Sequence, residues 1–181
     1  TIERVAANAV MAGCEPEHMP VLVAAVQAMA EPVFNLNGIQ SSTHCATPLL
    51  IVGGPLALAL NIHGGSGCFG PGPWCNGAIG RAIRLILLNI GGARPIEIDK
   101  AVMGHPGKFS YCIAENEAAS PWPPLRIERG FAPEVSTVTV IGGEAPHNIN
   151  DHESITAGSL LSMIAGAIAQ TLIAHARRLE R

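Results

Sequence analysis

The segment LLIVGG (49–54), followed by HGGSGCFGPGPWCNG (63–77) and AIGRAIRLILLN (78–89), decides the fold class of this chain. A short apolar run that stops at a glycine pair is typical of a buried strand. The third segment carries apolar residues at helical spacing and stops at a second glycine pair, Gly91-Gly92. A buried strand, a glycine-rich loop and an amphipathic helix in this order indicate helices packed on a sheet.

The rest of the chain continues this mixture of helices and short strands. From the spacing of apolar residues and the position of Pro95 we expect helices at 2–13, 17–30, 95–103 and from about 151 or 154 onward. Alternating patterns predict strands at 108–114 and, most clearly, at 136–143. We therefore predict one α/β or α+β domain over residues 1–181, with apolar helices on short, mostly buried strands. The start at Thr1 rather than Met is compatible with the C-terminal part of a longer chain.

The composition indicates a chain that buries much of its surface. Hydrophobic residues make up 48% of the chain and charged residues only 14%, against about 25% charged residues in an average domain. We therefore predict a homo-oligomer with the helix at 154–181 or the helix at 17–30 in the interface. The net charge is −3 and Lys and Arg do not cluster, which argues against a nucleic-acid partner.

The same composition bears on the cell compartment. The sequence contains no run of about 18 apolar residues, so no membrane helix is predicted. No positively charged leader precedes an apolar run, so no secretory signal is predicted either. The five cysteines are an odd number without a CxxC pair, which argues against a disulfide framework and a zinc ribbon. We therefore expect a cytoplasmic protein with reduced thiols and no membrane partner.

The glycine-rich loop at 64–77 is a candidate anion site. Backbone N–H groups at a helix start are unpaired and favour negative charge, and glycine lets the backbone approach a ligand closely. The pattern matches neither dinucleotide nor P-loop fingerprints, so nucleotide binding is not indicated. A carboxylate or phosphate of a small substrate is expected here, bound with the help of Ser66, Gly67, Cys68, Asn76 and Arg81.

A second polar cluster, GHPGKFSYCIAENE (104–117), is the candidate catalytic segment. In a regular strand Lys108 and Cys112 point to one face, so the ammonium group would favour a nucleophilic thiolate. Glu115 and Glu117 follow the strand, where loops usually carry catalytic groups, and are expected to move protons. Asn116 and His105 are assigned to substrate binding, and one cavity is expected to hold Cys112, a carboxylate and part of the 64–77 loop.

Scattered histidines leave a metal site open as a weaker alternative. His44, His105 and His147 each lie on a loop next to an apolar segment. Together with one of the glutamates 115, 117, 128 or 144 they would supply the imidazole and carboxylate ligands of a divalent metal. No HExxH-type spacing supports this set, so the cofactor requirement stays open.

Three segments resemble one bacterial family: NAVMAGCEPEHMP (8–20), GHPGKFSYCIAENEAASPW (104–122) and IERGF (127–131). The members of this family are fused to or paired with a small domain that bears CGSC, or UGSC with selenocysteine. That small domain is similar to the selenocysteine subunit of glycine reductase. The resemblance implies thiol or selenol chemistry on a small molecule, with the present chain as partner or substrate-binding half.

The family's pattern maps unevenly onto this chain. His44, Cys112, Glu115, Asn116 and Glu117 match it, and His44 is therefore added to the candidate catalytic residues. Cys45 and Cys75 stand where the family has other residues, which argues against a role for either, and the chain itself contains no CGSC.

Three functions remain open from the sequence. The first is an enzyme or catalytic subunit of reductase or lyase type that uses thiol chemistry on a small anionic or polar substrate. The second is a metal-dependent hydrolase or lyase with a His/Glu site, in which the metal polarises a carbonyl or activates water. The third is a non-catalytic binding or assembly subunit whose apolar helices form the interface.

Overall fold

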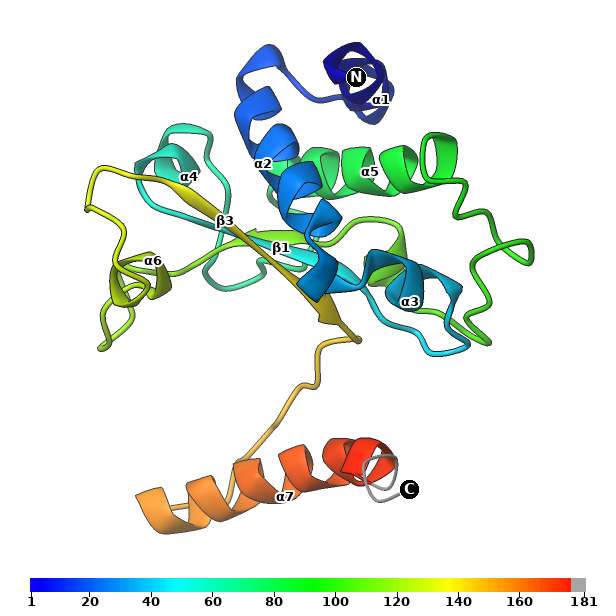
Figure 1. Ribbon diagram of the computed structural model, residues 1–181. Coiled ribbons are helices and arrows are strands. Elements are labelled where there is room, and N and C mark those ends of the chain that lie inside the picture. Colours follow the sequence, from blue (N-terminus) through cyan, green and yellow to red (C-terminus); the bar gives the residue numbers. More distant parts are fainter. Residues whose placement is uncertain (177–181) are drawn as a thin grey trace. The chain divides into compact units, whose positions relative to one another are not determined.

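The computed structural model in Figure 1 describes the backbone of residues 1–176 and the side chains of residues 1–169. Within the chain two compact units are distinguished, Thr1–Ala145 and Pro146–Arg181. The first unit contains the sheet, and the second contains the long helix α7 (Ala157–Ala176). The described residues form a mixed α/β structure, as the sequence predicts.

The sheet of the first unit has the strand order β2-β1-β3, with β1 (Thr47–Gly53) in the centre. The strand β2 (Cys112–Ala114) runs parallel to β1, with Leu50 opposite Cys112. The strand β3 (Thr137–Gly143) runs antiparallel, so that its last residue, Gly143, lies opposite Thr47. Residues before β1 and after β3 therefore meet at one end of the sheet, and residues after β1 and β2 meet at the other.

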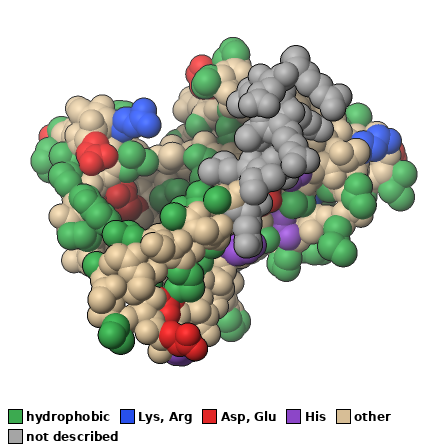
Figure 2. Space-filling view, turned by 90° about the horizontal axis from the view of Figure 1, so that it is seen from below, with side chains coloured by type: hydrophobic (Ala, Val, Ile, Leu, Met, Phe, Trp, Pro, Cys, Tyr) green, Lys and Arg blue, Asp and Glu red, His purple; other side chains and the backbone are tan. Residues whose placement is uncertain are grey.

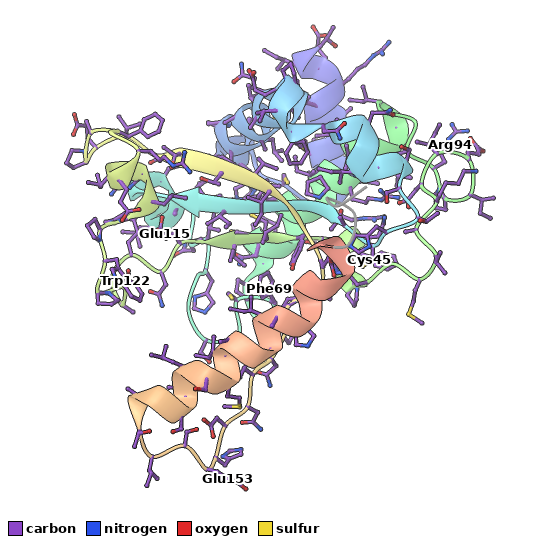
Figure 3. The ribbon with its side chains drawn as sticks, turned by 60° about the horizontal axis from the view of Figure 1, so that its bottom comes forward. Cys45, Phe69, Arg94, Glu115, Trp122 and Glu153 are labelled. Atoms are coloured by element: carbon purple, nitrogen blue, oxygen red, sulfur yellow. The ribbon has the colours of Figure 1, made fainter. Side chains whose placement is uncertain are left out.

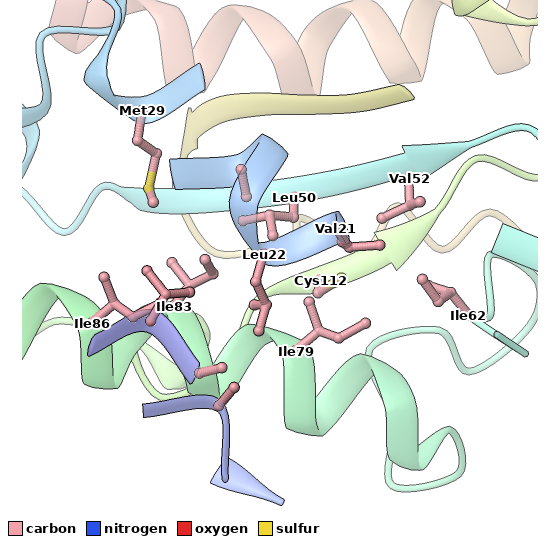
Figure 4. Close-up of a cluster of buried hydrophobic side chains, with 14 of the residues drawn as sticks. Val21, Leu22, Met29, Leu50, Val52, Ile62, Ile79, Ile83, Ile86 and Cys112 are labelled. Atoms are coloured by element: carbon pink, nitrogen blue, oxygen red, sulfur yellow. The ribbon is translucent and has the colours of Figure 1, made fainter. Parts of the chain in front are cut away.

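The helices α2 (Met19–Ala30) and α5 (Trp74–Asn89) lie against this sheet, and α1 (Ile2–Ala12) covers these helices on the side away from the strands. The helices α2 and α5 contact the strands, and α1 packs against α5 and α2. Figure 4 shows aliphatic side chains of α2, β1 and α5 meeting in one core, among them Leu22, Leu50 and Ile79, which are fully buried. Removing such side chains from water is the main favourable contribution to folding.

Turn chemistry sets where these helices begin and end. Gly13 adopts a left-handed conformation (φ 84°) after α1, and its N–H donates to carbonyl groups of the last helical turn, as in a glycine C-cap. Pro20 stands at the start of α2, where its missing N–H costs no helical hydrogen bond. The shorter elements are η1 (Pro16–His18), η2 (Pro32–Phe34), α3 (Leu36–Ser41), α4 (Pro55–Ala59), η3 (Pro106–Lys108) and α6 (Leu125–Glu128).

Two predicted elements differ in the structure. The expected helix at 95–103 is wrong: Ile98 and Asp99 donate to the carbonyl of Arg94, and Ile96 donates back to Asp99, so the chain closes a tight turn instead. The expected strand at 108–114 shrinks to β2, because Pro106 opens the single turn η3 and Nδ1 of His105 accepts from the Gly107 N–H at 3.1 Å. A strand cannot begin until this turn has ended.

The length and hydropathy of the helices bear on whether any of them could span a membrane. No single helix within residues 1–169, where α7 is taken only as far as Ala169, is long and apolar enough to cross a membrane. Only the segments Pro16–Ala30 and Pro32–Ser41 reach the required length and hydropathy together, and they are bent by 74°.

Candidate functional site

Polar side chains gather at both ends of the sheet. Figure 3 shows Cys45 at one end and Glu115 at the other. The arrangement follows from the register, because Cys45 precedes β1 and Glu115 follows β2, which is parallel to it. The chain therefore has two separate groups of candidate residues, and each has its own neighbours.

At the first end, His44, Cys45 and Glu144 form a cluster that we call the His44 cluster. The Nε2 atom of His44 and Oε1 of Glu144 are 2.5 Å apart, and the side chains are 42% and 43% exposed. One nitrogen of His44, the Sγ atom of Cys45 and one carboxylate oxygen of Glu144 all lie within 4.8 Å of one another. The antiparallel pairing of β1 with β3 brings the two halves of the cluster together.

Tyr111 and His105 lie at the same end of the sheet as the His44 cluster. The phenol of Tyr111 donates to the backbone carbonyl of Glu144 at 2.6 Å. The rings of His105 and Phe69 lie 5.5 Å and 5.2 Å from the Tyr111 ring, centroid to centroid. Phe69 belongs to the glycine-rich loop, so this loop reaches the His44 cluster through an aromatic contact.

His105 is held neutral by its surroundings. Burial lowers the pKa of its imidazole below the usual range, and the charge of Lys108 acts in the same direction. The backbone of Gly143 and Cys45 and the charge of Glu144 oppose this shift. The Nε2 atom is buried and makes no well-formed hydrogen bond, although the backbone of Gly143 and Cys45 lies beside it. Since Nδ1 accepts from Gly107, Nε2 carries the proton and is a donor.

A cleft of about 980 Å³ opens next to His105, between α5 and the loop from 95 to 109. In Figure 1 this loop extends beyond the end of α5. Its ionisable lining consists of Arg81, Arg84, Asp99, Lys100, His105 and Lys108. Four cationic side chains thus face one carboxylate, in a chain whose net charge is −3.

Asp99 neutralises only part of this charge. Its carboxylate accepts from Arg84 at 3.2 Å and from Lys108 at 2.9 Å. Burial alone would raise the pKa of Asp99, but the hydrogen bonds from Lys108 and the Ala101 N–H and the two cationic charges hold it below the usual value. Arg81 forms no ion pair within the described part of the chain. Its guanidinium is therefore available to a ligand.

At the other end of the sheet, Glu117 holds the backbone together. Its carboxylate accepts from the Gly54 N–H at 2.7 Å and from Nε and Nη2 of Arg126 at 2.9 Å each. The Arg126 hydrogen bond is the main reason that the pKa of Glu117 lies below its usual value. Glu115 accepts from the Leu125 N–H at 2.9 Å. Both carboxylates thus anchor the segment 124–126 to the sheet, which differs from the expected role in proton transfer.

Cys112 contradicts the prediction of a nucleophilic thiol. Figure 4 shows its side chain inside the aliphatic core, near Leu22 and Ile79, and it is 3% exposed. Burial raises the pKa of the Cys112 thiol far above its usual range, because a thiolate would lose its hydration there. Lys108 does not help to ionise it, since its ammonium group binds Asp99. A substrate has no described access to this sulfur.

The side chain of Asn76 organises the glycine-rich loop. The Asn76 side chain accepts from the His63 N–H at 2.8 Å and donates to the carbonyls of His63 and Cys68. The N–H groups of Cys68 and Gly70 are also bonded within the loop. Arg81 lines the cleft beside η3, away from this loop. Asn76 therefore stabilises the loop, and Arg81 lines a cleft that the loop residues 64–77 do not line.

Several predicted substrate-binding residues lie outside the two described cavities. The smaller cavity, of about 490 Å³, is lined by α2, α3 and the end of α5. Neither this cavity nor the cleft is lined by Ser66, Gly67, Cys68, Asn116, Cys112, Glu115 or Glu117. Neither of these two cavities therefore brings Cys112, a glutamate and the loop together in the way that the sequence predicts. Ser66 and Asn116 are exposed, and Gly67 has a left-handed conformation that serves its turn.

The histidines predicted for the alternative metal site lie in different parts of the structure. His44 and His105 do lie at the same end of the sheet, and Glu144 joins them. His147 belongs to the second unit.

Sequence reasoning discounted Cys45 because it departs from the resembled pattern, although its position next to His44 was a usable signal. Asp99 and Lys100 were missed because their segment was taken for a helix.

Comparisons of the chain with models of protein families, with curated proteins and with solved structures gave no match.

Proposed function

We propose that this chain is the substrate-binding half of an enzyme that acts on a small anionic molecule. The observation that carries the proposal is the cleft beside α5, in which cationic side chains converge although the chain as a whole is acidic. Its size suits a small molecule, since ligand pockets span roughly 300–1,000 Å³. A carboxylate or a phosphate is the complementary ligand.

The cations of the cleft differ in what they can do for such a ligand. Arg84 is buried and committed to Asp99, so it sets the charge of the wall rather than contacting solvent. Arg81 is partly exposed on the same face of α5 and has the forked geometry that binds carboxylate and phosphate in two-point fashion. Lys108, like Arg84, is bound to Asp99, and Lys100 is an exposed cation of the same lining.

The reacting thiol or selenol is proposed to come from outside this chain. Cys112 is buried in the core, so it does not offer the sulfur that the first hypothesis needs. The resemblance to the CGSC- and UGSC-associated family supports a partner domain that supplies it. A metal-dependent hydrolase or lyase is the second candidate, and it is favoured by the compact His44 cluster beside the cleft.

Anion binding is tested on the full chain with inorganic phosphate and acetate as probes, by calorimetric titration at low ionic strength. Arg81→Gln is expected to weaken phosphate binding about tenfold or more, since a hydrogen bond to a charged group contributes about 1.5–3 kcal/mol. Arg129→Gln, at an exposed position outside the cleft, is the matched control and should bind like the parent. Equal affinity of the parent and the Arg81 variant, or no binding by the parent, would contradict the proposal.

A further inference from the structure

We infer that the His44 cluster is a binding site for a divalent transition-metal ion of the zinc type. The three side chains offer one imidazole nitrogen, one thiolate sulfur and one carboxylate oxygen. This mixture of nitrogen, sulfur and oxygen favours zinc over magnesium or calcium, which prefer oxygen alone. The site is separate from the cationic cleft and does not depend on the cleft binding an anion.

The distances fit an ion after a small movement. Zinc binds sulfur at about 2.3 Å and nitrogen or oxygen at about 2.0–2.2 Å, so ligand atoms around one tetrahedral ion lie roughly 3.3–3.7 Å apart. The three ligand atoms already lie within 4.8 Å of one another. The contact of 2.5 Å between His44 and Glu144 must widen and any pair near 4.8 Å must close, and the side chains of His44 and Glu144 are about two-fifths exposed.

The backbone beneath the ligands is fixed. His44 and Cys45 stand immediately before β1, and the His44 N–H donates to Oγ of Ser42 at 2.9 Å. Glu144 follows β3 directly, and its carbonyl accepts from the Tyr111 phenol. A site built on strand ends loses little chain entropy when an ion binds, because the backbone is already ordered.

A second observation points to the same place. His105 presents a buried Nε2–H donor that makes no well-formed hydrogen bond, although the backbone of Gly143 and Cys45 lies beside it. Buried donors are normally satisfied, because leaving one unpaired lowers the stability of the folded state. A thiolate at Cys45, which metal binding creates by displacing the thiol proton, would be a suitable acceptor. Three protein ligands leave a fourth position for water or substrate, as in catalytic zinc sites.

The position of His105 relates the ion to the proposed function. His105 lines the cationic cleft and also lies beside the backbone of Cys45, so it connects the His44 cluster with the cleft. Such an ion would act as a Lewis acid on a carbonyl or phosphoryl oxygen. This consequence rests on the proposed anion site, whereas the metal site itself does not.

The experiment is a titration of the full, reduced and metal-free chain with Co²⁺, followed by absorption spectroscopy. A thiolate ligand gives a near-ultraviolet charge-transfer band, and tetrahedral coordination gives visible bands. We expect one ion per chain and both features. Cys45→Ser should abolish the charge-transfer band, and Glu144→Gln should weaken binding at least tenfold. Cys68→Ser removes a partly buried thiol of the glycine-rich loop and is the matched control.

The outcomes separate the metal site from the anion site. A band that persists in Cys45→Ser, or disappears equally in Cys68→Ser, would place the ion elsewhere and overturn the inference. Absence of Co²⁺ and Zn²⁺ binding by the folded parent, checked by circular dichroism, would do the same. Phosphate titration of the metal-free chain tests the cleft separately, so either site can fail while the other stands.

Discussion

A thiol surrounded by aliphatic side chains is a packing residue, and Cys112 has that environment. Its sulfur fills the space between α2, β2 and α5, where a small apolar group is needed. The neighbouring thiols of Cys14 and Cys75 are close enough to disfavour a thiolate further. The chemistry of this chain therefore does not pass through its most buried cysteine.

Replacement of Cys112 by serine is expected to change stability and not ligand binding. The serine hydroxyl would be buried without a designed partner, which costs about 1–3 kcal/mol of unfolding free energy. Urea denaturation measures this loss, and phosphate titration should give the parent's affinity. Cys68→Ser should change the free energy of unfolding by less than about 0.5 kcal/mol. A stable Cys112→Ser variant that no longer binds phosphate would restore a functional role for the thiol.

The ion pair of Glu117 with Arg126 predicts a dependence of stability on pH. Because the pKa of Glu117 is lowered in the folded state, its contribution is fully present above the ordinary value of 4.5 and is lost as the pH falls through the folded pKa. Glu117→Gln should therefore unfold at lower urea concentration at pH 7, with a smaller decrease below pH 4.5 than the parent shows. Glu134→Gln, at an exposed position, is the control. Parallel pH profiles for parent and Glu117→Gln would show that the pair does not act in this way.

At the level of elements, the approach of the glycine-rich loop to β2 depends on a missing side chain. A Cβ atom added to Gly64 would overlap the backbone carbonyl of Ala114, which cannot move without breaking the strand. At Gly72 a Cβ atom would meet no atom within 4 Å. The two glycines therefore have different roles, although they stand in one loop.

Gly64→Ala is expected to lower the free energy of unfolding by about 3 kcal/mol, the upper end of what overpacking costs. Gly72→Ala should change it by less than about 0.5 kcal/mol, because its site is open. Urea denaturation of the two variants provides the comparison. If both variants match the parent, the loop does not approach β2 as closely as the structure places it.

The longer elements could be predicted from sequence because periodicity alone specifies them. The helix ending at Gly13 and the strand at 136–143 have clear patterns and are confirmed with small shifts of their ends. The turn at 95–99 could not be predicted, since it places Ile96 at φ 71°, a conformation that β-branched residues rarely adopt. The side chain of Arg84 in α5 also holds this turn by donating to the Ala93 carbonyl and to Asp99, and a local sequence pattern does not predict such contacts.

The residues of the candidate site were also only partly predictable from the sequence. Arg81, Lys108 and His105 were recognised from sequence as ligand-binding or catalytic residues, and they do share one cleft. Their partners were not recognised, because these depend on strand register and on where β2 begins. The role expected of Cys112 failed for the same reason: sequence alternation assigns a residue to a face but does not say which face is buried.

At the level of the whole molecule, the surface carries many apolar side chains. Hydrophobic groups are scattered over the face drawn in Figure 2, whereas Lys and Arg side chains are few there. In the second unit, Leu161 of α7 is 64% exposed. The helix α2 exposes less apolar surface, because its residues Val21, Leu22 and Met29 face the core of its own unit. The part of 154–181 beyond residue 176 lies outside the described residues.

We therefore predict a homo-oligomer that is held together through α7. An apolar helix face left in water is unfavourable, and contact with a second copy would remove it. Leu161→Glu would place a charge in such an interface, where burial without a partner is costly. The parent is expected to exceed the monomer mass of 18.8 kDa in light scattering at micromolar concentration, and Leu161→Glu is expected to approach it. Val33→Glu, a change at a 94% exposed position in η2, should keep the parent's mass. A monomeric parent would exclude the oligomer, and an oligomer unaffected by Leu161→Glu would move the interface away from this face of α7.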